Sequence, residues 1–178
     1  MQIKTADLKA VLLAAGKKGI RYYLNGVHVN SRHIVATDGH RMHVIAHGGD
    51  WPHDPVTIPR EVVELAVKAK TLELTLTTEA LGAISYKPID GIYPDYMRVI
   101  PTQTEVVTGE RHIDVNPEYW RDAEKAIKLT GWRGEFPALS HVGNCWYWCN
   151  GRLAVVVMPQ RMINPKTGQK GYQLERLQ

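Results

Sequence analysis

The sequence predicts an α+β fold built from three consecutive copies of a β-α-β-β-β unit. Three observations along the 178 residues predict it. Stretches with helical apolar periodicity alternate with groups of short strand patterns. Two-residue turn signals such as Asp38-Gly39 and Asn150-Gly151 separate neighbouring strands. The same order of elements then occurs three times, although the copies share little sequence identity.

The first copy begins with a minimal strand at 2–4 and a helix from about 6 to 18. The helix is predicted because four apolar residues recur on one face: Leu8, Val11, Leu12 and Ala15. Three strands rich in β-forming residues follow at 21–30, 33–37 and 42–46. The turn between the last two strands carries Thr37, Asp38, His40 and Arg41. A plain hairpin does not need these side chains, so they mark a candidate site.

The second copy has a strand at 55–59, a helix at 60–70 and strands at 72–77 and 83–87. The helix is expected to bury Val62, Val63, Leu65 and Ala66. In the strand after it, Leu72, Leu74 and Leu76 alternate with polar residues and are expected to face inward.

The third copy has a strand at 112–115, a helix from Pro117 to about Thr130, and strands at 136–142, 145–149 and 153–158. Asn116 is expected to cap this helix, and proline is well tolerated at a first helical position. In strand 145–149, Trp146 and Trp148 alternate with Tyr147. This pattern predicts either an exposed aromatic face that makes a subunit contact or a strand that is buried on both faces.

Composition indicates an ordinary globular protein, with 44% hydrophobic and 22% charged residues. The net charge of +4 and the pI near 9.1 weakly favour a polyanionic partner. We expect a cytoplasmic protein, since no signal-peptide pattern and no membrane-spanning apolar stretch occurs. The two cysteines, Cys145 and Cys149, do not make a disulfide framework and are expected to be small core residues.

An enzyme or a metal site is not predicted. His33, His40, His43 and His47 lie near Asp38, but their spacing matches neither a strand-face pair nor a helical pair of metal ligands. These histidines are expected to face solvent. The chain shows no nucleophile–base pattern, no phosphate loop and no paired carboxylates, so we expect no catalytic residues and no cofactor.

Four ordered motifs resemble the bacterial DNA polymerase III beta sliding clamp family. They are residues 21–26, 35–41, 93–101 and 155–162. The resemblance implies the sliding-clamp (DNA clamp) fold, with antiparallel sheets and helices on one face. It also implies three parts: 1–102 like the clamp's middle domain, 103–162 like the second half of its last domain, and 163–178 as a polar, basic tail. The family's first domain and the first half of its last domain have no counterpart.

The resemblance implies a groove that receives short apolar peptides. Its walls, matched residue by residue, are Leu24, Thr37, Gly39, His40, Arg41, Met42, Pro101, Val156, Met158 and Pro159. The apolar members form a socket, in which methionine adapts to varied guests, and His40 and Arg41 are expected to hydrogen-bond the guest. Gln160 and Met42 depart from the apolar residue and the leucine that are common there. The alternative is that these are only core residues of a decayed clamp.

The resemblance also implies that helices present cations to duplex DNA. The expected residues are Lys9, Lys17, Lys18, Lys68, Lys70, Arg121, Lys125 and Lys128. Contacts to phosphates would be independent of sequence and sensitive to salt. The alternative is an ordinary solvated face, because four acidic residues are interspersed: Glu61, Glu64, Asp122 and Glu124.

The expected function is that of a shortened sliding clamp in DNA replication or repair. It would bind clamp-motif peptides of a DNA polymerase or clamp loader, duplex DNA, or both. One alternative is a non-encircling peptide-binding module that competes with a full clamp for its partners. The other is a basic DNA-binding protein with a vestigial groove.

A homo-oligomer is expected, because a third repeat without its usual mate leaves a sheet edge uncovered. A dimer is favoured, and a ring of four chains is the larger alternative. The tail residues 173–177, QLERL, resemble a clamp-binding peptide. They are expected either to occupy a groove or to form a disordered end.

Overall fold

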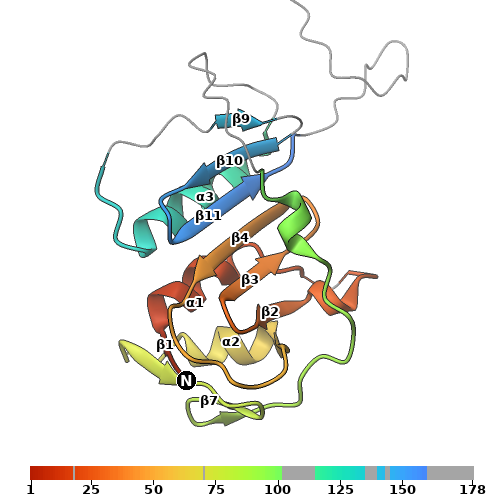
Figure 1. Ribbon diagram of the computed structural model, residues 1–178, viewed down its shortest axis with the longest axis vertical. Helices are drawn as coiled ribbons and strands as arrows, with labels where there is room; N and C mark the ends of the chain where they lie inside the picture. The colour runs from red at the N-terminus through yellow and green to blue at the C-terminus, as the bar shows by residue number, and fades with distance from the viewer. Residues whose placement is uncertain (18, 70, 102–114, 135–139, 143–144, 160–178) are drawn as a thin grey trace, which may run out of the picture.

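The computed structural model describes residues 1–17, 19–69, 71–101, 115–134, 140–142 and 145–159. Within these residues the centre is a seven-stranded sheet in the order β5-β2-β3-β4-β11-β10-β9, with every neighbouring pair antiparallel (Figure 1). Its strands are β2 (Gly26–Val29), β3 (His33–Thr37), β4 (Arg41–Ala46), β5 (Val56–Pro59), β9 (Ser140–Val142), β10 (Cys145–Cys149) and β11 (Leu153–Val157). Two small antiparallel pairs lie beside it. They are β1 (Gln2–Lys4) with β6 (Glu73–Thr75), and β7 (Ala80–Leu81) with β8 (Ile84–Ser85).

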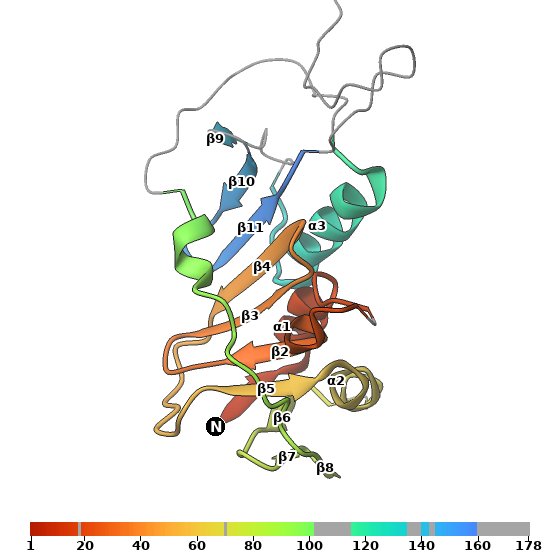
Figure 2. The ribbon, with the colours of Figure 1, turned by 90° about the vertical axis from the view of Figure 1, so that its right-hand side faces the viewer.

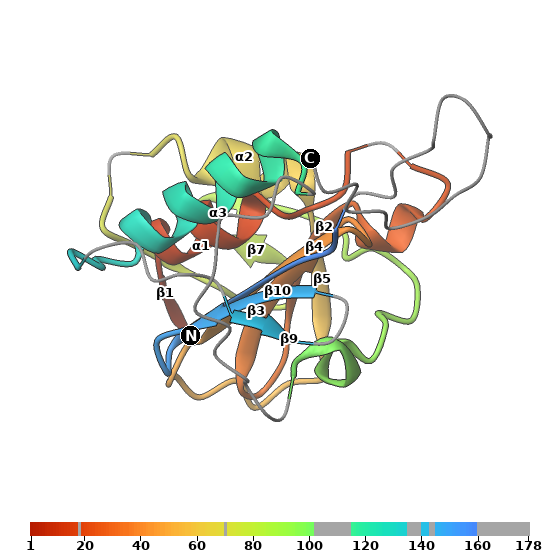
Figure 3. The same cartoon turned by 90° about the horizontal axis from the view of Figure 1, so that it is seen from above.

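The helices lie together on one face of the large sheet, as predicted (Figures 2 and 3). They are α1 (Thr5–Leu12), α2 (Arg60–Ala66) and α3 (Pro117–Leu129). Two short 3₁₀ helices, η1 (Tyr22–Leu24) and η2 (Tyr96–Val99), lie in the connections. The predicted cap of α3 is present, since the Asn116 side chain accepts a hydrogen bond from the Glu118 amide and Pro117 opens the helix.

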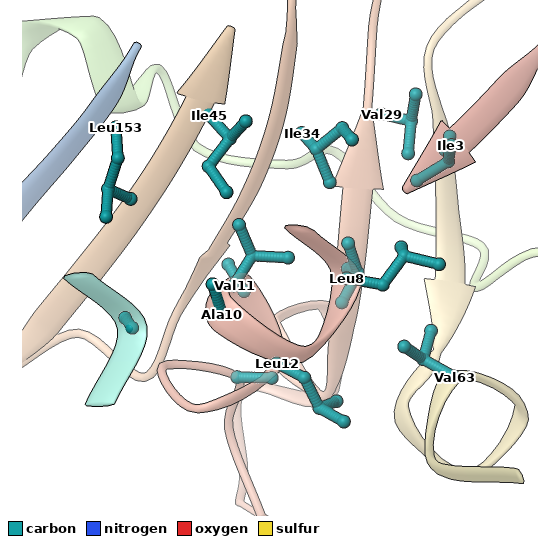
Figure 4. Close-up of a cluster of buried hydrophobic side chains, with 14 of the residues drawn as sticks. Ile3, Leu8, Ala10, Val11, Leu12, Val29, Ile34, Ile45, Val63 and Leu153 are labelled. Atoms are coloured by element: carbon teal, nitrogen blue, oxygen red, sulfur yellow. The ribbon is translucent and has the colours of Figure 1, made fainter. Parts of the chain in front are cut away.

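The main core fills the space between the helices and the sheet. Leu8 and Val11 of α1 are fully buried, as are Ile34, Ile45 and Leu153 of three neighbouring strands (Figure 4). The apolar stripe read from the α1 sequence is therefore the face that packs on the sheet. Because Leu8 belongs to the first repeat, Val63 to the second and Leu153 to the third, this core spans all three repeats.

The first and third repeats form one continuous sheet. β11 pairs antiparallel with β4, in a register that runs from Leu153 opposite Ile45 to Val157 opposite Arg41. An ion pair from Arg152 to the buried Asp7 of α1 adds a polar link at the start of β11. The prediction that the third repeat has a free sheet edge is thus wrong for β11, because β11 pairs with β4 of the same chain.

Several predicted boundaries are wrong, each for a visible reason. The first helix ends at Leu12, and the Ala14 and Ala15 amides bond three residues back instead of continuing it. Residues 22–24 form η1 rather than a strand, because the Leu24 amide bonds to Arg21 O and its carbonyl is taken by the Gly16 amide. The second helix likewise ends early, at Ala66.

Two leucines expected to be buried are exposed. Leu72 is 89% exposed because β6 begins at Glu73, so strand alternation does not yet govern Leu72. Leu65 is 54% exposed, whereas Val63 and Ala66 supply the buried face of α2. The expected strands at 112–115 and 136–142 fall mostly outside the described residues, which include Val115 and the strand β9.

Candidate functional site

The pairing of β4 with β11 brings together the two halves of the expected groove. Met42 and Val156 are direct partners across the ladder. Just beyond them, the Met158 amide donates a hydrogen bond of 2.7 Å to the His40 carbonyl. Four of the predicted site residues, from segments more than a hundred positions apart, therefore lie side by side.

Side chains at this joint alternate between the two faces of the sheet. On β4, His43 and Ile45 point toward the helices, and Met42 and Val44 point away from them. The outward residues form a second apolar group, here called the outer cluster: Val35, Met42, Val44, Tyr96, Cys145, Ala154 and Val156. Met158 and Ile100 are partly buried and pack against it. The face opposite the helices is thus apolar where the groove was expected.

The chain from residue 88 to 101, here called the strap, crosses this outer face, in green in Figure 2. The Ile89 amide bonds to Thr57 O of β5 at 2.9 Å. Tyr93 stacks on His28 with ring centroids 4.3 Å apart, and burial lowers the pKa of His28 to about 4, which keeps the imidazole neutral. The strap ends with Ile100 against the outer cluster, which places Pro101 next to it.

Tyr96 anchors the far end of the strap. Its hydroxyl accepts a hydrogen bond from Asn30 Nδ2 at 2.8 Å and shares another with His33 Nδ1 at 2.9 Å. Burial lowers the pKa of His33, so the neutral ring suits this contact. The sequence motif around Tyr96 pointed to the strap, but nothing in the sequence identified Asn30 or His33 as its partners.

Polar groups of the β3–β4 turn are engaged in closing the turn. Thr37 Oγ1 donates to Arg41 O and accepts from the Gly39 amide, and Asp38 Oδ1 accepts from the amides of His40 and Arg41. Gly39 has φ of 91°, which favours glycine, and an added Cβ would lie 2.8 Å from Arg21 Nη1. Leu24, on the same segment as Arg21, is buried. These residues shape the turn that presents His40, which is exposed.

Arg41 does not lie on the outer face. It is 7% exposed, forms ion pairs with Asp38 and with Asp122 of α3, and its guanidinium carbon lies 4.4 Å from the centre of the Tyr119 ring. The expected hydrogen bond from Arg41 to a guest would therefore require it to leave two carboxylates. Arg41 instead ties the turn to α3, and His40 stacks on the same tyrosine at 6.3 Å. Sequence reasoning took Asp122 only as an acid on the helix face and did not link it or Tyr119 to Arg41, because both lie some eighty positions further along the chain.

The described members of the expected DNA-contacting set lie on the helices or shortly after them. Exposed members are Lys9, Lys17, Lys68, Arg121, Lys125 and Lys128, whereas Lys18 and Lys70 lie outside the described residues. On α3, which runs beside α1 (Figure 3), two interspersed acids are engaged. Asp122 pairs with Arg41, and Glu124 accepts a hydrogen bond from Trp120 Nε1. Within the described part of the chain, only Asp122 of these two acids has its charge offset by a cation from outside the helix, Arg41 of β4.

The histidines and cysteines occupy varied environments. His43 is fully buried, with Nδ1 bonded to Ala10 O, and burial lowers its pKa to about 4, so the expectation that it faces solvent is wrong. Cys145 is buried as expected, but Cys149 is exposed. Among the described residues no group of three or more His, Cys, Asp or Glu side chains is arranged to hold a metal ion. The described helices include none with the length and apolarity needed to cross a membrane.

The aromatic strand β10 is covered on both sides. Trp146 and Trp148 are buried in the main core, and Tyr147 packs against the outer cluster. Of the two alternatives read from the sequence, burial holds for the tryptophans on one face, and Tyr147 on the other face is partly buried. Gln160 and the tail at 163–178 lie outside the described residues.

No family model matches the chain. The beta sliding clamp of Caulobacter vibrioides is 34% identical over 103 residues, which are 46% of this chain and 28% of that protein. The beta sliding clamp of Vibrio cholerae is 30% identical over 125 residues, which are 58% of this chain and 34% of that protein.

Two solved structures share the fold. The DNA polymerase sliding clamp from Pseudomonas aeruginosa matches with a TM-score of 0.63 at 18% identity, covering 91% of this chain and 66% of that one. DNA polymerase III subunit beta from Borrelia burgdorferi matches with a TM-score of 0.66 at 16% identity, covering 90% of this chain and 63% of that one.

The chain therefore has the sliding-clamp fold. It is similar in sequence to the bacterial beta sliding clamp, the beta subunit of DNA polymerase III, as the four motifs implied. It spans 28% and 34% of the length of the two curated relatives described above.

Proposed function

We propose that the chain is a non-enzymatic, clamp-like protein of DNA replication or repair that recruits partners through the outer face of the β4–β11 joint. Its guests would be short apolar peptide segments of a DNA polymerase or a clamp loader. One observation carries the proposal: the β4–β11 register sets Met42 opposite Val156, and the Met158 amide bonds to His40 O. Two sequence segments that have no local reason to meet are thus joined at the place where the family resemblance expects a groove.

The chemistry of these residues supports a peptide guest. Met42 and Val156 are buried and would form the floor of the socket, while the partly buried Met158 supplies apolar surface, and methionine side chains adapt to different shapes. The exposed His40 imidazole offers a hydrogen-bonding group at the rim. A sliding clamp of Pseudomonas aeruginosa with the same fold has been solved bound to griselimycin. Arg41 holds the turn and has no proposed contact with the guest.

The test measures the binding of a clamp-motif peptide by calorimetry. We expect a micromolar Kd, which corresponds to a binding free energy of about 8 kcal/mol in magnitude. Met158→Ala should weaken binding about tenfold, which is about 1.4 kcal/mol, because it removes apolar surface from the socket. His40→Ala should weaken it in the same direction.

Leu65→Ala is the matched control, because it truncates an exposed apolar side chain on the helix side, away from the joint. It should leave the Kd unchanged. Peptide-induced NMR shifts confined to residues far from Met42, Val156 and Met158 would contradict the proposal.

Duplex DNA is a second proposed ligand, favoured by the exposed cations on α3. Arg121, Lys125 and Lys128 are exposed, and Asp122 between them pairs with Arg41 of β4. If the chain binds the peptide but not duplex DNA, the result would favour the alternative of a module that competes with a full clamp for its partners. If it binds duplex DNA but not the peptide, the result would favour a DNA-binding protein with a vestigial groove.

Self-association is likewise a proposal, with a dimer favoured and a ring of four as the larger form. The pairing of β11 with β4 covers the strand edge that was one reason to expect self-association. Among the described strands, β5 and β9 end the large sheet and leave two edges for another chain. The three-part division of the chain and the cytoplasmic location also remain proposals.

A further inference from the structure

The apolar floor of the proposed socket is covered by the chain's own strap. Met42 and Val156 are only 3% and 1% exposed, although a guest in the socket would have to reach them. The strap crosses this face of the sheet (Figure 2), where Tyr96 belongs to the outer cluster and Ile100 packs against it. A guest that reached the floor would therefore compete with these two strap residues for the same apolar surface.

The helix η2, which lies within the strap, turns one side to the sheet and the other to solvent. Met97 and Val99 are 51% and 46% exposed, whereas Tyr96 is buried. The Ile100 amide bonds to Met97 O at 3.2 Å, a contact that is internal to the strap. Because this bond does not involve the sheet, η2 would keep it if the segment lifted from the sheet as a unit.

The Tyr96 hydroxyl fastens η2 to the sheet. It lies 2.8 Å from Asn30 Nδ2 and 2.9 Å from His33 Nδ1, at the connection between β2 and β3. Asn30 and His33 are half-buried, so water can replace the hydroxyl as their partner when Tyr96 leaves, which keeps the cost of opening small. Near the start of the strap, the bond from the Ile89 amide to Thr57 O holds the chain to β5 and gives a fixed point about which η2 would swing.

We infer that the strap is an autoinhibitory cover, in which η2 lies on the socket of the free chain and must lift before an apolar peptide binds. Apolar side chains of the guest would then take the places of Tyr96 and Ile100 over the outer cluster. The apparent affinity for the guest is lowered in proportion to the fraction of molecules in which the strap is open. The inference rests on the proposed function, because the socket that the strap regulates is the proposed peptide site.

The test compares the peptide affinity of the wild type with that of Tyr96→Phe, by calorimetry on the full chain. The variant keeps the ring in the outer cluster and removes only the hydroxyl that contacts Asn30 and His33. Because it loosens the covered state and leaves the socket in place, it should tighten the Kd of the peptide about fivefold. This change corresponds to the loss of one hydrogen bond with a net contribution of about 1 kcal/mol.

Tyr86→Phe is the matched control. It makes the same chemical change at a tyrosine that precedes the strap, packs against the main core and donates a hydrogen bond of 2.8 Å to Thr77 O. It should leave the Kd of the peptide unchanged. NMR gives a second readout, because nuclear Overhauser contacts of Ile100 with the outer cluster should be present in the free wild type and lost when the peptide saturates it.

An unchanged or weaker peptide affinity in Tyr96→Phe would overturn the inference, as would an equal gain in Tyr86→Phe. Ile100 contacts that persist in the peptide-bound wild type would also overturn it, and in that case the proposed function would stand without autoinhibition. Binding by Tyr96→Phe but not by the wild type would support the inference, because the fastened strap would then close the socket completely. Absence of binding by both proteins would overturn the proposed function and this inference with it.

Discussion

Arg41→Ala is expected to lower the free energy of unfolding by about 3 kcal/mol, a large share of the about 5–15 kcal/mol typical of a domain. Arg41 is 7% exposed, and its removal leaves Asp38, which is 17% exposed, and Asp122, which is 32% exposed, without their shared cation. The cation–π contact with Tyr119 is lost as well. Because Asp122 and Tyr119 belong to α3, the variant should loosen the third repeat from the first. Urea denaturation followed by circular dichroism measures the change as a shift in the midpoint.

Arg98→Ala is the matched control for that measurement. Arg98 also pairs with an aspartate three residues before it, Asp95, but the two side chains are 84% and 59% exposed. Exposed pairs contribute at most about 1 kcal/mol because water screens them. Midpoints that shift equally in the two variants would contradict the assignment of Arg41 as the link between the turn and α3.

Reversal of two charges on α3, Arg121→Glu with Lys125→Glu, is expected to reduce duplex DNA affinity roughly a hundredfold or more at low salt, because attraction to the phosphates becomes repulsion. Both residues are exposed, and the net charge changes by four units. The logarithm of the wild-type binding constant should also fall linearly with the logarithm of salt concentration. Anisotropy titrations of a labelled duplex at several salt concentrations provide both readouts.

A charge-matched control separates a local contact from net charge alone. Lys87→Glu with Arg98→Glu makes the same change in net charge at two exposed residues in and before the strap. If α3 contacts the phosphates, this control should keep most of the affinity. A salt-independent wild-type affinity, or equal losses in both double variants, would rule out the α3 face.

Local sequence signals correctly predicted the elements whose tertiary contacts favour the same structure as the local sequence does. The apolar run at 33–37 and the Asp38-Gly39 turn predicted β3 and the hairpin to β4, and Asn116-Pro117 predicted the start of α3. Residues 22–24 show the limit of such signals. Their pattern resembles a strand, but the Leu24 carbonyl is taken by the Gly16 amide, and ladder pairing with β5 begins only at Gly26. Tertiary contacts override local preference there.

The candidate site was only partly predictable from sequence. The family resemblance named Met42, Val156 and Met158 together, and the β4–β11 register places them together. Arg41 had been expected to hydrogen-bond the guest because the family resemblance placed it in the groove with His40. Strand alternation instead directs its side chain to α3, where Asp122 supplies a carboxylate that no local pattern could reveal. The contacts of Tyr96 with Asn30 and His33 were not predicted either, because these residues also lie far from Tyr96 in the sequence.

The central claim is that the third repeat completes the sheet of the first within one chain, and so assembles the outer site. NMR on a mixture of isotope-labelled and unlabelled chains tests this most directly. We expect nuclear Overhauser contacts between β4 and β11, such as Met42 with Val156 and Val44 with Ala154, in a uniformly labelled sample. The same contacts should be absent from the filtered spectrum that reports only pairs between labelled and unlabelled chains. Contacts of β4 with β11 seen only in the filtered spectrum, or in neither spectrum, would contradict the account.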